Sequence, residues 1–144
     1  MIVLKGAEVS AKIREDVQKM LGELGGIIPK LAIVRVGENP DDLSYERGAV
    51  KKMENFGLRV QCYGFPADIE EETFLRELKS INEDGDIDGI LVLRPLPSHI
   101  SSKAVEEEIH PGKDLDGISP VNIAKVFSGD ETGFAPCTCL LYTS

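Results

Sequence analysis

One helical face near the start of the chain carries side chains that could bind a flat ligand. Four residues of a predicted helix at about 40–56 share this face, at spacings i, i+3, i+4 and i+7: Tyr45, Gly48, Ala49 and Lys52. Glycine inside a helix costs about 0.5–1 kcal/mol relative to alanine, so helix stability does not explain the gap that follows the aromatic ring. Two explanations remain open. Either a neighbouring strand packs into the gap, or a flat ligand lies there against Tyr45.

A second set of candidate site residues follows a predicted inner strand at 86–93. The segment "LRPLP" at 93–97 comes at the end of this strand, and its two prolines make a rigid wall there. Ligands of open α/β sheets bind at the carboxyl ends of the strands, so a site is expected around this segment, the turn after Val36 and the loop at 110–120. Arg94 lies at the predicted mouth, where a surface ion pair with an acidic residue is the simplest explanation for it.

Two carboxylates stand two residues apart in the loop "KDLDG" at 113–117, namely Asp114 and Asp116. A carboxylate accepts two parallel N–H hydrogen bonds, which suits the amino edge of a pyrimidine-type ring. It equally suits the capping of a helix. The spacing alone does not choose between these roles.

The elements that must position these residues alternate between strand and helix patterns. Apolar β-type runs are predicted as strands at 2–4, 31–36, 58–65 and 86–93. Segments of helical period follow them at 8–24, 40–56, 70–83 and 101–109. This order predicts an α/β fold with three αβα layers and a mostly parallel sheet, in which the nearly continuous apolar runs are inner strands.

Composition restricts the classes of partner. The 144 residues suffice for one domain with its own core, and the formal net charge of −9 disfavours nucleic acid and anionic membranes. The first 25 residues carry several charges and no long apolar stretch, so we expect no secretory signal. The longest apolar run, at 90–93, is too short to cross a bilayer. A cytoplasmic protein with a small-molecule ligand is expected.

The usual metal and phosphate motifs are absent from the sequence. The three cysteines, Cys62, Cys137 and Cys139, form no CxxC pair, and "DGDIDG" at 84–89 begins like a calcium loop but has Pro95 where a bidentate glutamate is required. The turn "VGENP" at 36–40 matches neither GxGxxG nor GxxxxGK. We therefore expect no metal and no phosphate-binding loop.

Several of these segments, taken in order, resemble the catalytic domain of the bifunctional methylenetetrahydrofolate dehydrogenase/cyclohydrolase family. They are "LAIVRVGENP", the tyrosine of "SYERGAVKK", "DGILVLRPLP", "HPGKDLDGISPVN" and "FAPCT". The resemblance implies an enzyme that oxidises 5,10-methylenetetrahydrofolate to the methenyl form with NAD(P) and then hydrolyses it to 10-formyltetrahydrofolate. It places this catalytic, folate-binding domain at residues 1–138, and it implies a homodimer as the starting expectation for the longer protein.

The resemblance also assigns roles to residues. It implies that Tyr45 stacks on the folate, that Asp116 holds the pterin edge, and that the segment from Val92 to Pro95 lines the pocket together with the helix face at Gly48 and Ala49. This favours the flat-ligand explanation of the gapped helix face.

The sequence departs from the family pattern at two positions. Ala49 stands where the family has a lysine that positions and activates the attacking water, and Leu93 stands where the family has a glutamine that holds this lysine. We therefore expect the dehydrogenase reaction to survive and the cyclohydrolase reaction to be weakened or to use a substitute cation. Lys52 is the first candidate for that cation and Arg94 the second. A non-catalytic folate-binding module is the alternative.

The family's second domain, of Rossmann type, binds NAD(P) and is missing from this sequence, so the choice between NAD and NADP is made elsewhere. The last six residues, "CLLYTS" at 139–144, fall outside the resemblance and can be encoded by a sequence used in preparing sequencing libraries. We expect them to be a non-native tail on a truncated reading frame.

Overall fold

The computed structural model describes residues 6–136, which form five helices and three strands. In chain order these are α1 (Gly6–Glu23), β1 (Lys30–Val36), α2 (Pro40–Asn55), β2 (Arg59–Phe65), α3 (Glu71–Glu83), β3 (Gly89–Val92), α4 (Ser102–Glu108) and α5 (Pro120–Ser128). The strand predicted at 2–4 and the tail at 139–144 lie outside the described residues, as do Cys137 and Cys139.

The three strands form a parallel sheet in the order β2-β1-β3. The central strand, β1, aligns Leu31 with Val60 of β2 and with Gly89 of β3. The loop at 113–115 then runs beside β3, because Ile90 donates its N–H to the carbonyl of Lys113 at 2.7 Å. This pairing brings the loop with the two carboxylates to the sheet.

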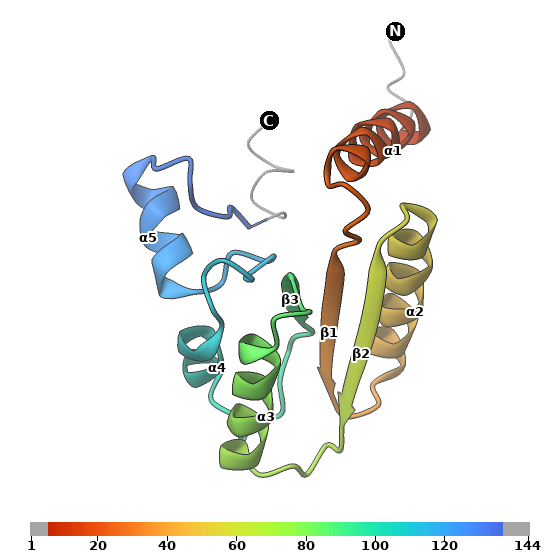
Figure 1. Ribbon diagram of the computed structural model, residues 1–144. Helices are drawn as coiled ribbons and strands as arrows, with labels where there is room; N and C mark the ends of the chain where they lie inside the picture. The colour runs from red at the N-terminus through yellow and green to blue at the C-terminus, as the bar shows by residue number, and fades with distance from the viewer. Residues whose placement is uncertain (1–5, 137–144) are drawn as a thin grey trace, which may run out of the picture.

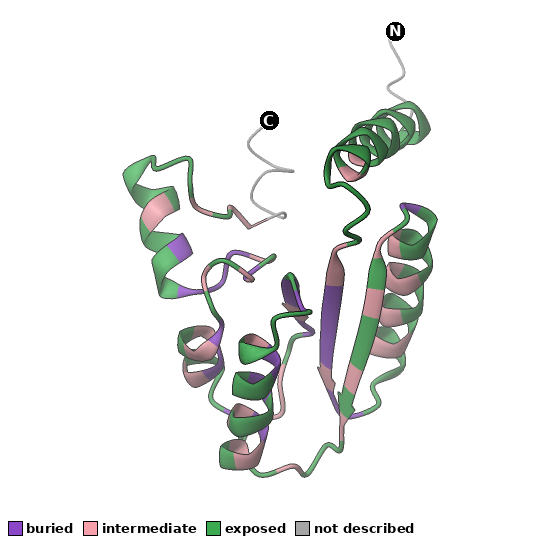
Figure 2. Cartoon of the chain, in the orientation of Figure 1, coloured by how far each residue is buried: buried purple, intermediate pink, exposed green. Residues whose placement is uncertain are grey.

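Helices cover both faces of the sheet, which confirms the predicted three-layer α/β fold (Figure 1). On one face, alternate residues of β1 and β3 pack against α3 and α4, with Phe74 fully buried and its ring edge-on to Phe65 at 5.5 Å. On the other face α2 packs against Leu31 and Ile33. The buried residues accordingly concentrate in β1, β3 and the inner side of α3 (Figure 2).

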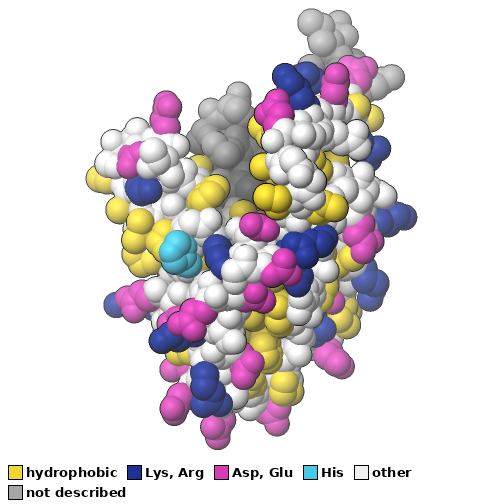
Figure 3. Space-filling view, viewed as in Figure 1, with side chains coloured by type: hydrophobic (Ala, Val, Ile, Leu, Met, Phe, Trp, Pro, Cys, Tyr) yellow, Lys and Arg dark blue, Asp and Glu magenta, His cyan; other side chains and the backbone are white. Residues whose placement is uncertain are grey.

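Helix α1 has the predicted bounds within two residues, but in the described part of the chain it covers neither face of the sheet. None of its residues is buried, and its apolar side chains, which include Val9, Ile13 and Met20, lie exposed. Figure 3 shows hydrophobic side chains at the surface over this helix. Among residues 6–136, no helix combines the length and apolar character needed to cross a membrane.

Strand β3 is shorter than predicted because the aspartates that precede it are used in a turn. Asp84 accepts a hydrogen bond from the N–H of Asp86, and Asp86 in turn forms ion pairs with Lys30 and Arg59 at 3.0 and 2.7 Å. Asp88 accepts from the N–H of Lys30 at 2.8 Å. Each carboxylate of "DGDIDG" thus stabilises the passage from α3 into the sheet, and the strand begins at residue 89.

Candidate functional site

A cleft of about 410 Å³ opens at the carboxyl end of β3, between the first turns of α2 and the loop at 113–117. Eight residues line it: Asp41, Asp42, Tyr45, Leu91, Val92, Leu93, Arg94 and Asp116. Five of them, Tyr45, Val92, Leu93, Arg94 and Asp116, are residues that the sequence nominated. The structure therefore brings together one aromatic ring, one guanidinium and one nominated carboxylate from three separate segments.

The start of α2 determines how Tyr45 faces the cleft. Asn39 caps the helix by accepting the N–H of Asp41 at 2.9 Å, and Pro40 occupies the first helical position, where its missing N–H is not needed. One turn later the side chain of Tyr45 is 58% exposed, so its ring face is available to a ligand. Asp41 and Asp42 also line the cleft, and they were missed because acidic residues in the first turn are common helix stabilisers.

Four nominated residues do not line the cleft: Gly48, Ala49, Lys52 and Pro95. A side chain built at Gly48 would meet nothing within 4 Å, so no strand packs there. Ala49, by contrast, packs against the sheet beside Leu93. Packing against the sheet therefore accounts for Ala49, whereas Gly48 neither packs against a strand nor lines the cleft. Lys52 is exposed in the last part of α2, further along the helix from the cleft.

The two departures from the family pattern touch the same apolar cluster. Leu93 is 9% exposed and is buried with Leu31 and Ile33, and Ala49 packs against this group. A lysine and a glutamine at these positions would place two polar groups on an apolar surface. Alanine and leucine instead form a packed cluster without an unsatisfied amide.

Replacing Leu93 by glutamine should lower the free energy of unfolding by about 1–2 kcal/mol, because apolar contacts are lost and a largely buried amide gains no partner. The double variant Ala49→Lys/Leu93→Gln should lose less free energy of unfolding than the sum of the losses in the two single variants, since the new amide then has a partner. Urea unfolding of the four proteins of the cycle measures this. Leu93→Met is the volume-matched control. Strict additivity would show that the positions do not interact.

Arg94 forms ion pairs with two carboxylates on different segments. Its Nη2 lies 3.2 Å from Oδ2 of Asp116, and its Nη1 lies 3.7 Å from Oε1 of Glu106 on α4. The expected surface ion pair of Arg94 is therefore present, and one partner is the carboxylate nominated for ligand binding. Glu106 was not foreseen, because nothing in the sequence shows that α4 brings it to the end of β3.

The two carboxylates of "KDLDG" differ in their surroundings. Asp114 is 1% exposed and accepts from the N–H groups of Ile118 and Ser119 at 3.1 and 2.8 Å and from Nδ2 of Asn122 at 2.9 Å. It thereby holds the two residues that precede α5, whose N-cap is Ser119. Asp116 instead points toward the cleft and Arg94.

Burial would by itself raise the pKa of Asp114. The hydrogen bonds from Asn122, Ser119 and Ile118 outweigh this effect, and the pKa lies below its ordinary value. Asp114 is therefore ionised at neutral pH and fixes the geometry of the loop.

Further contacts hold this loop so that Asp116 has a defined position. The ammonium group of Lys113 donates to the carbonyls of Asn82 and Asp84 at 2.7 Å each, at the end of α3. Gly117 has φ of 64°, and a side chain there would approach the carbonyl of Phe134 to 2.5 Å. The glycine after Asp116 is thus required both by the turn and by the close approach of residues 134–136.

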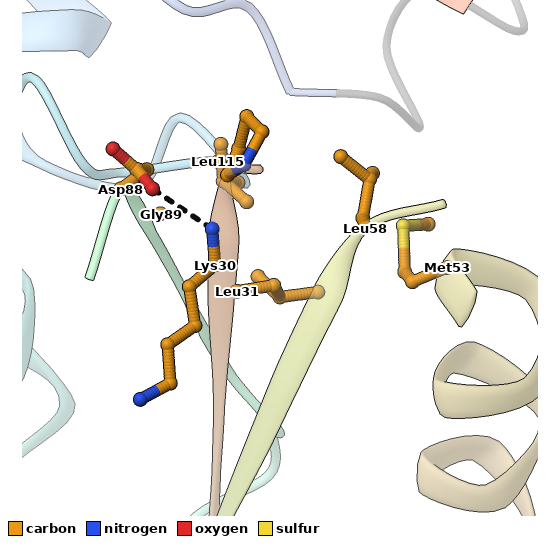
Figure 4. A pocket seen from close by; sticks show the side chains of 8 residues that line it. Lys30, Leu31, Met53, Leu58, Asp88, Gly89 and Leu115 are labelled. Atoms are coloured by element: carbon orange, nitrogen blue, oxygen red, sulfur yellow. Dashed lines mark hydrogen bonds between the residues drawn. The ribbon is translucent and has the colours of Figure 1, made fainter. Parts of the chain in front are cut away.

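A smaller apolar cavity of about 200 Å³ lies at the opposite, amino end of the strands (Figure 4). Leu31, Met53, Leu58 and Leu115 supply most of its wall, and its polar groups, the N–H of Lys30 and the carboxylate of Asp88, bind each other. The cavity is therefore walled mainly by apolar side chains. In residues 6–136, no three His, Cys, Asp or Glu side chains gather in a way that could hold a metal ion.

Comparison with known proteins identifies relatives that match nearly the whole chain. Residues 4–116 match the family described as tetrahydrofolate dehydrogenase/cyclohydrolase, catalytic domain. The bifunctional protein FolD of Clostridium kluyveri is 45% identical over 139 residues, which are 95% of this chain and 49% of that protein.

Two solved structures show the same fold. The FolD enzyme of Campylobacter jejuni, a methylenetetrahydrofolate dehydrogenase/cyclohydrolase, superposes with a TM-score of 0.87 at 35% identity, over 92% of this chain and 48% of that one. The Trypanosoma brucei enzyme, solved with NADP cofactor and inhibitor, superposes with a TM-score of 0.86 at 29% identity, over 95% of this chain and 48% of that one. This chain spans about half the length of the relatives it matches. The chain belongs to the tetrahydrofolate dehydrogenase/cyclohydrolase family, of which it contains the catalytic domain.

Proposed function

We propose that this chain is the folate-binding part of a cytoplasmic enzyme that oxidises 5,10-methylenetetrahydrofolate to 5,10-methenyltetrahydrofolate with NAD(P). The observation that carries the proposal is that one cleft contains both the exposed ring of Tyr45 and the carboxylate of Asp116. A reduced pteridine has a flat face and an edge of adjacent N–H donors. The cleft offers a partner for each.

In this proposal the chain's own residues bind and orient the substrate. The ring of Tyr45 stacks on the pteridine or the adjoining aryl group, and Asp116 accepts two hydrogen bonds from the amino edge. Leu91 and Leu93 form an apolar floor that excludes water from one face of the ligand. Oxidation of a bound methylene group mainly requires that its carbon be held in a fixed position, and these contacts can do this without a proton-transferring residue.

NAD(P), which accepts the hydride, does not fit the residues present. Among the described residues, the turns that lead from β1, β2 and β3 into the following helices lack the glycine spacing that lets a backbone approach a pyrophosphate. We therefore assign cofactor binding, and the choice between NAD and NADP, to a part of the longer protein outside this chain. A homodimer of that protein also remains a proposal.

Hydrolysis of the methenyl product to 10-formyltetrahydrofolate needs a group that handles the water's proton, and the cleft has no lysine. Of the two substitute cations, Arg94 lines the cleft and Lys52 does not. This reverses the order of the candidates expected from the sequence. Because a guanidinium stays protonated, Arg94 can orient water or stabilise negative charge, but it cannot serve as a general base. We propose a weakened cyclohydrolase reaction.

Titration of this chain with 5-formyltetrahydrofolate, a stable tetrahydrofolate, tests the proposal by calorimetry. We expect saturable binding that weakens about 10-fold in Tyr45→Ala, since an aromatic contact contributes about 1 kcal/mol or more. Tyr45→Phe, which keeps the ring, should bind like the parent chain.

Absence of binding by the unaltered chain would reject the folate pocket. An affinity that is unchanged in Tyr45→Ala would show that the ligand binds elsewhere. A non-catalytic folate-binding module would bind equally well, and it is separated from the enzyme by assaying oxidation of 5,10-methylenetetrahydrofolate with NAD(P) in the longer protein.

A further inference from the structure

Arg94 is the shared partner of two carboxylates that come from different parts of the fold. Asp116 lies 3.2 Å from one guanidinium nitrogen and Glu106 lies 3.7 Å from another. Among the described residues, neither carboxylate forms an ion pair with any other group. The three side chains are partly exposed, so each pairing is exchangeable rather than locked.

The closer pairing conflicts with the role that the proposed function gives to Asp116. A pteridine amino edge needs both carboxylate oxygens for two parallel hydrogen bonds, and Oδ2 of Asp116 already accepts from Arg94 at 3.2 Å. The ligand therefore competes with the guanidinium for this oxygen. A guanidinium that loses this contact keeps a carboxylate partner only if a second carboxylate is within reach.

We propose that Glu106 is a positioning residue, which alone holds the guanidinium of Arg94 when the ligand binds the carboxylate of Asp116. The inference rests on the proposed function for the identity of the ligand, but the exchange itself is a property of the three side chains. Arg94 pairs with both carboxylates before binding and with Glu106 alone after it, and the loss of one partly exposed ion pair costs little free energy. Glu106 also keeps the guanidinium beside the bound ligand, in a cleft whose lining contains no lysine.

The position of Glu106 follows from the way α4 is held. Ser101 caps the helix by accepting the N–H of Ala104 at 3.2 Å, and Val105 is buried in the core between the helices and the sheet. The residue after Val105 is thereby directed toward the end of β3. Glu107, one residue further, is instead exposed and lies 3.8 Å from Lys103 on the same helix. It provides a matched control.

The exchange can be tested without any ligand. Asp116→Asn removes the carboxylate charge that pairs with Arg94, and so imitates a ligand that occupies this carboxylate. Arg94 should then pair with Glu106 alone. Urea unfolding of this chain measures the coupling between Arg94→Met and Glu106→Gln, expressed as a factor in the unfolding equilibrium constant. This factor should be about two- to fivefold larger in the Asp116→Asn background than in the background with Asp116. A coupling that is zero or unchanged in the Asp116→Asn background would overturn the proposal.

Ligand binding gives the second readout. In titrations with 5-formyltetrahydrofolate, Glu106→Gln should weaken binding about two- to fivefold, whereas Glu107→Gln should leave it unchanged. The effect of Glu106→Gln should vanish in an Arg94→Met background, which a merely structural role of Glu106 would not produce. Equal effects in both backgrounds would refute the exchange. If the unaltered chain does not bind this probe, the proposed function fails, and the unfolding cycle alone decides on the exchange.

Discussion

Replacing Asp114 by asparagine should lower the free energy of unfolding by about 3 kcal/mol. The carboxylate is almost completely buried and accepts hydrogen bonds from two backbone N–H groups and from Asn122. An asparagine has one acceptor oxygen, and its amide group would confront the remaining donors. At least one buried donor then loses its partner, and the charge that stabilises the start of α5 is lost. Urea unfolding followed by circular dichroism measures the change.

The same carboxylate should make stability depend on pH. The pKa of Asp114 in the folded chain lies below its ordinary value, so its stabilising effect is fully present above the pKa of the unfolded chain. It is lost as the pH falls below about 4 and through the folded pKa. Unfolding curves of the unaltered chain and Asp114→Asn should therefore converge in acid. A difference that is the same at pH 3 and pH 7 would contradict this assignment.

Replacing Asp116 by asparagine should weaken the binding of 5-formyltetrahydrofolate about 100-fold. In the proposed complex the carboxylate accepts two charge-assisted hydrogen bonds, and an asparagine would keep one acceptor and turn an N–H group toward the ligand's donors. The loss of about 3 kcal/mol corresponds to that factor. Calorimetric titration of the two proteins gives the ratio directly.

The two aspartate variants are controls for each other, because they lie two residues apart in one loop. Asp116→Asn should unfold almost like the unaltered chain, since its partner Arg94 keeps Glu106. The effect of Asp114→Asn should appear first in stability. If Asp116→Asn also lowered stability by several kcal/mol, its effect on binding would have to be ascribed to a disordered loop.

Much of the fold was predictable because local patterns and packing agree. The run "LAIVRV" is apolar throughout, as an inner parallel strand must be, and it became the central strand β1. Helix α5 was not predicted, although Ser119 and Pro120 at its start and Gly129 after its end are ordinary boundary signals. The exposure of the apolar side chains on α1 could not be predicted, because periodicity shows an amphipathic face but not what covers it.

The site shows the same division. Tyr45, Arg94 and Asp116 were nominated from separate segments, and the parallel topology brings them to one cleft. Which aspartate of "KDLDG" is buried depends on Asn122 and on the N–H groups of Ile118 and Ser119, eight or fewer residues away in sequence but oriented only by the fold. The contact between Arg94 and Glu106 depends on where α4 docks, and no local pattern encodes that.

The packing of Ala49 against the cluster of Leu93, Leu31 and Ile33 has a consequence for the history of this protein. Introducing a lysine at position 49 or a glutamine at position 93 alone should lower stability, because each would place a polar group against this cluster. The two positions are therefore expected to change together in evolution rather than one at a time.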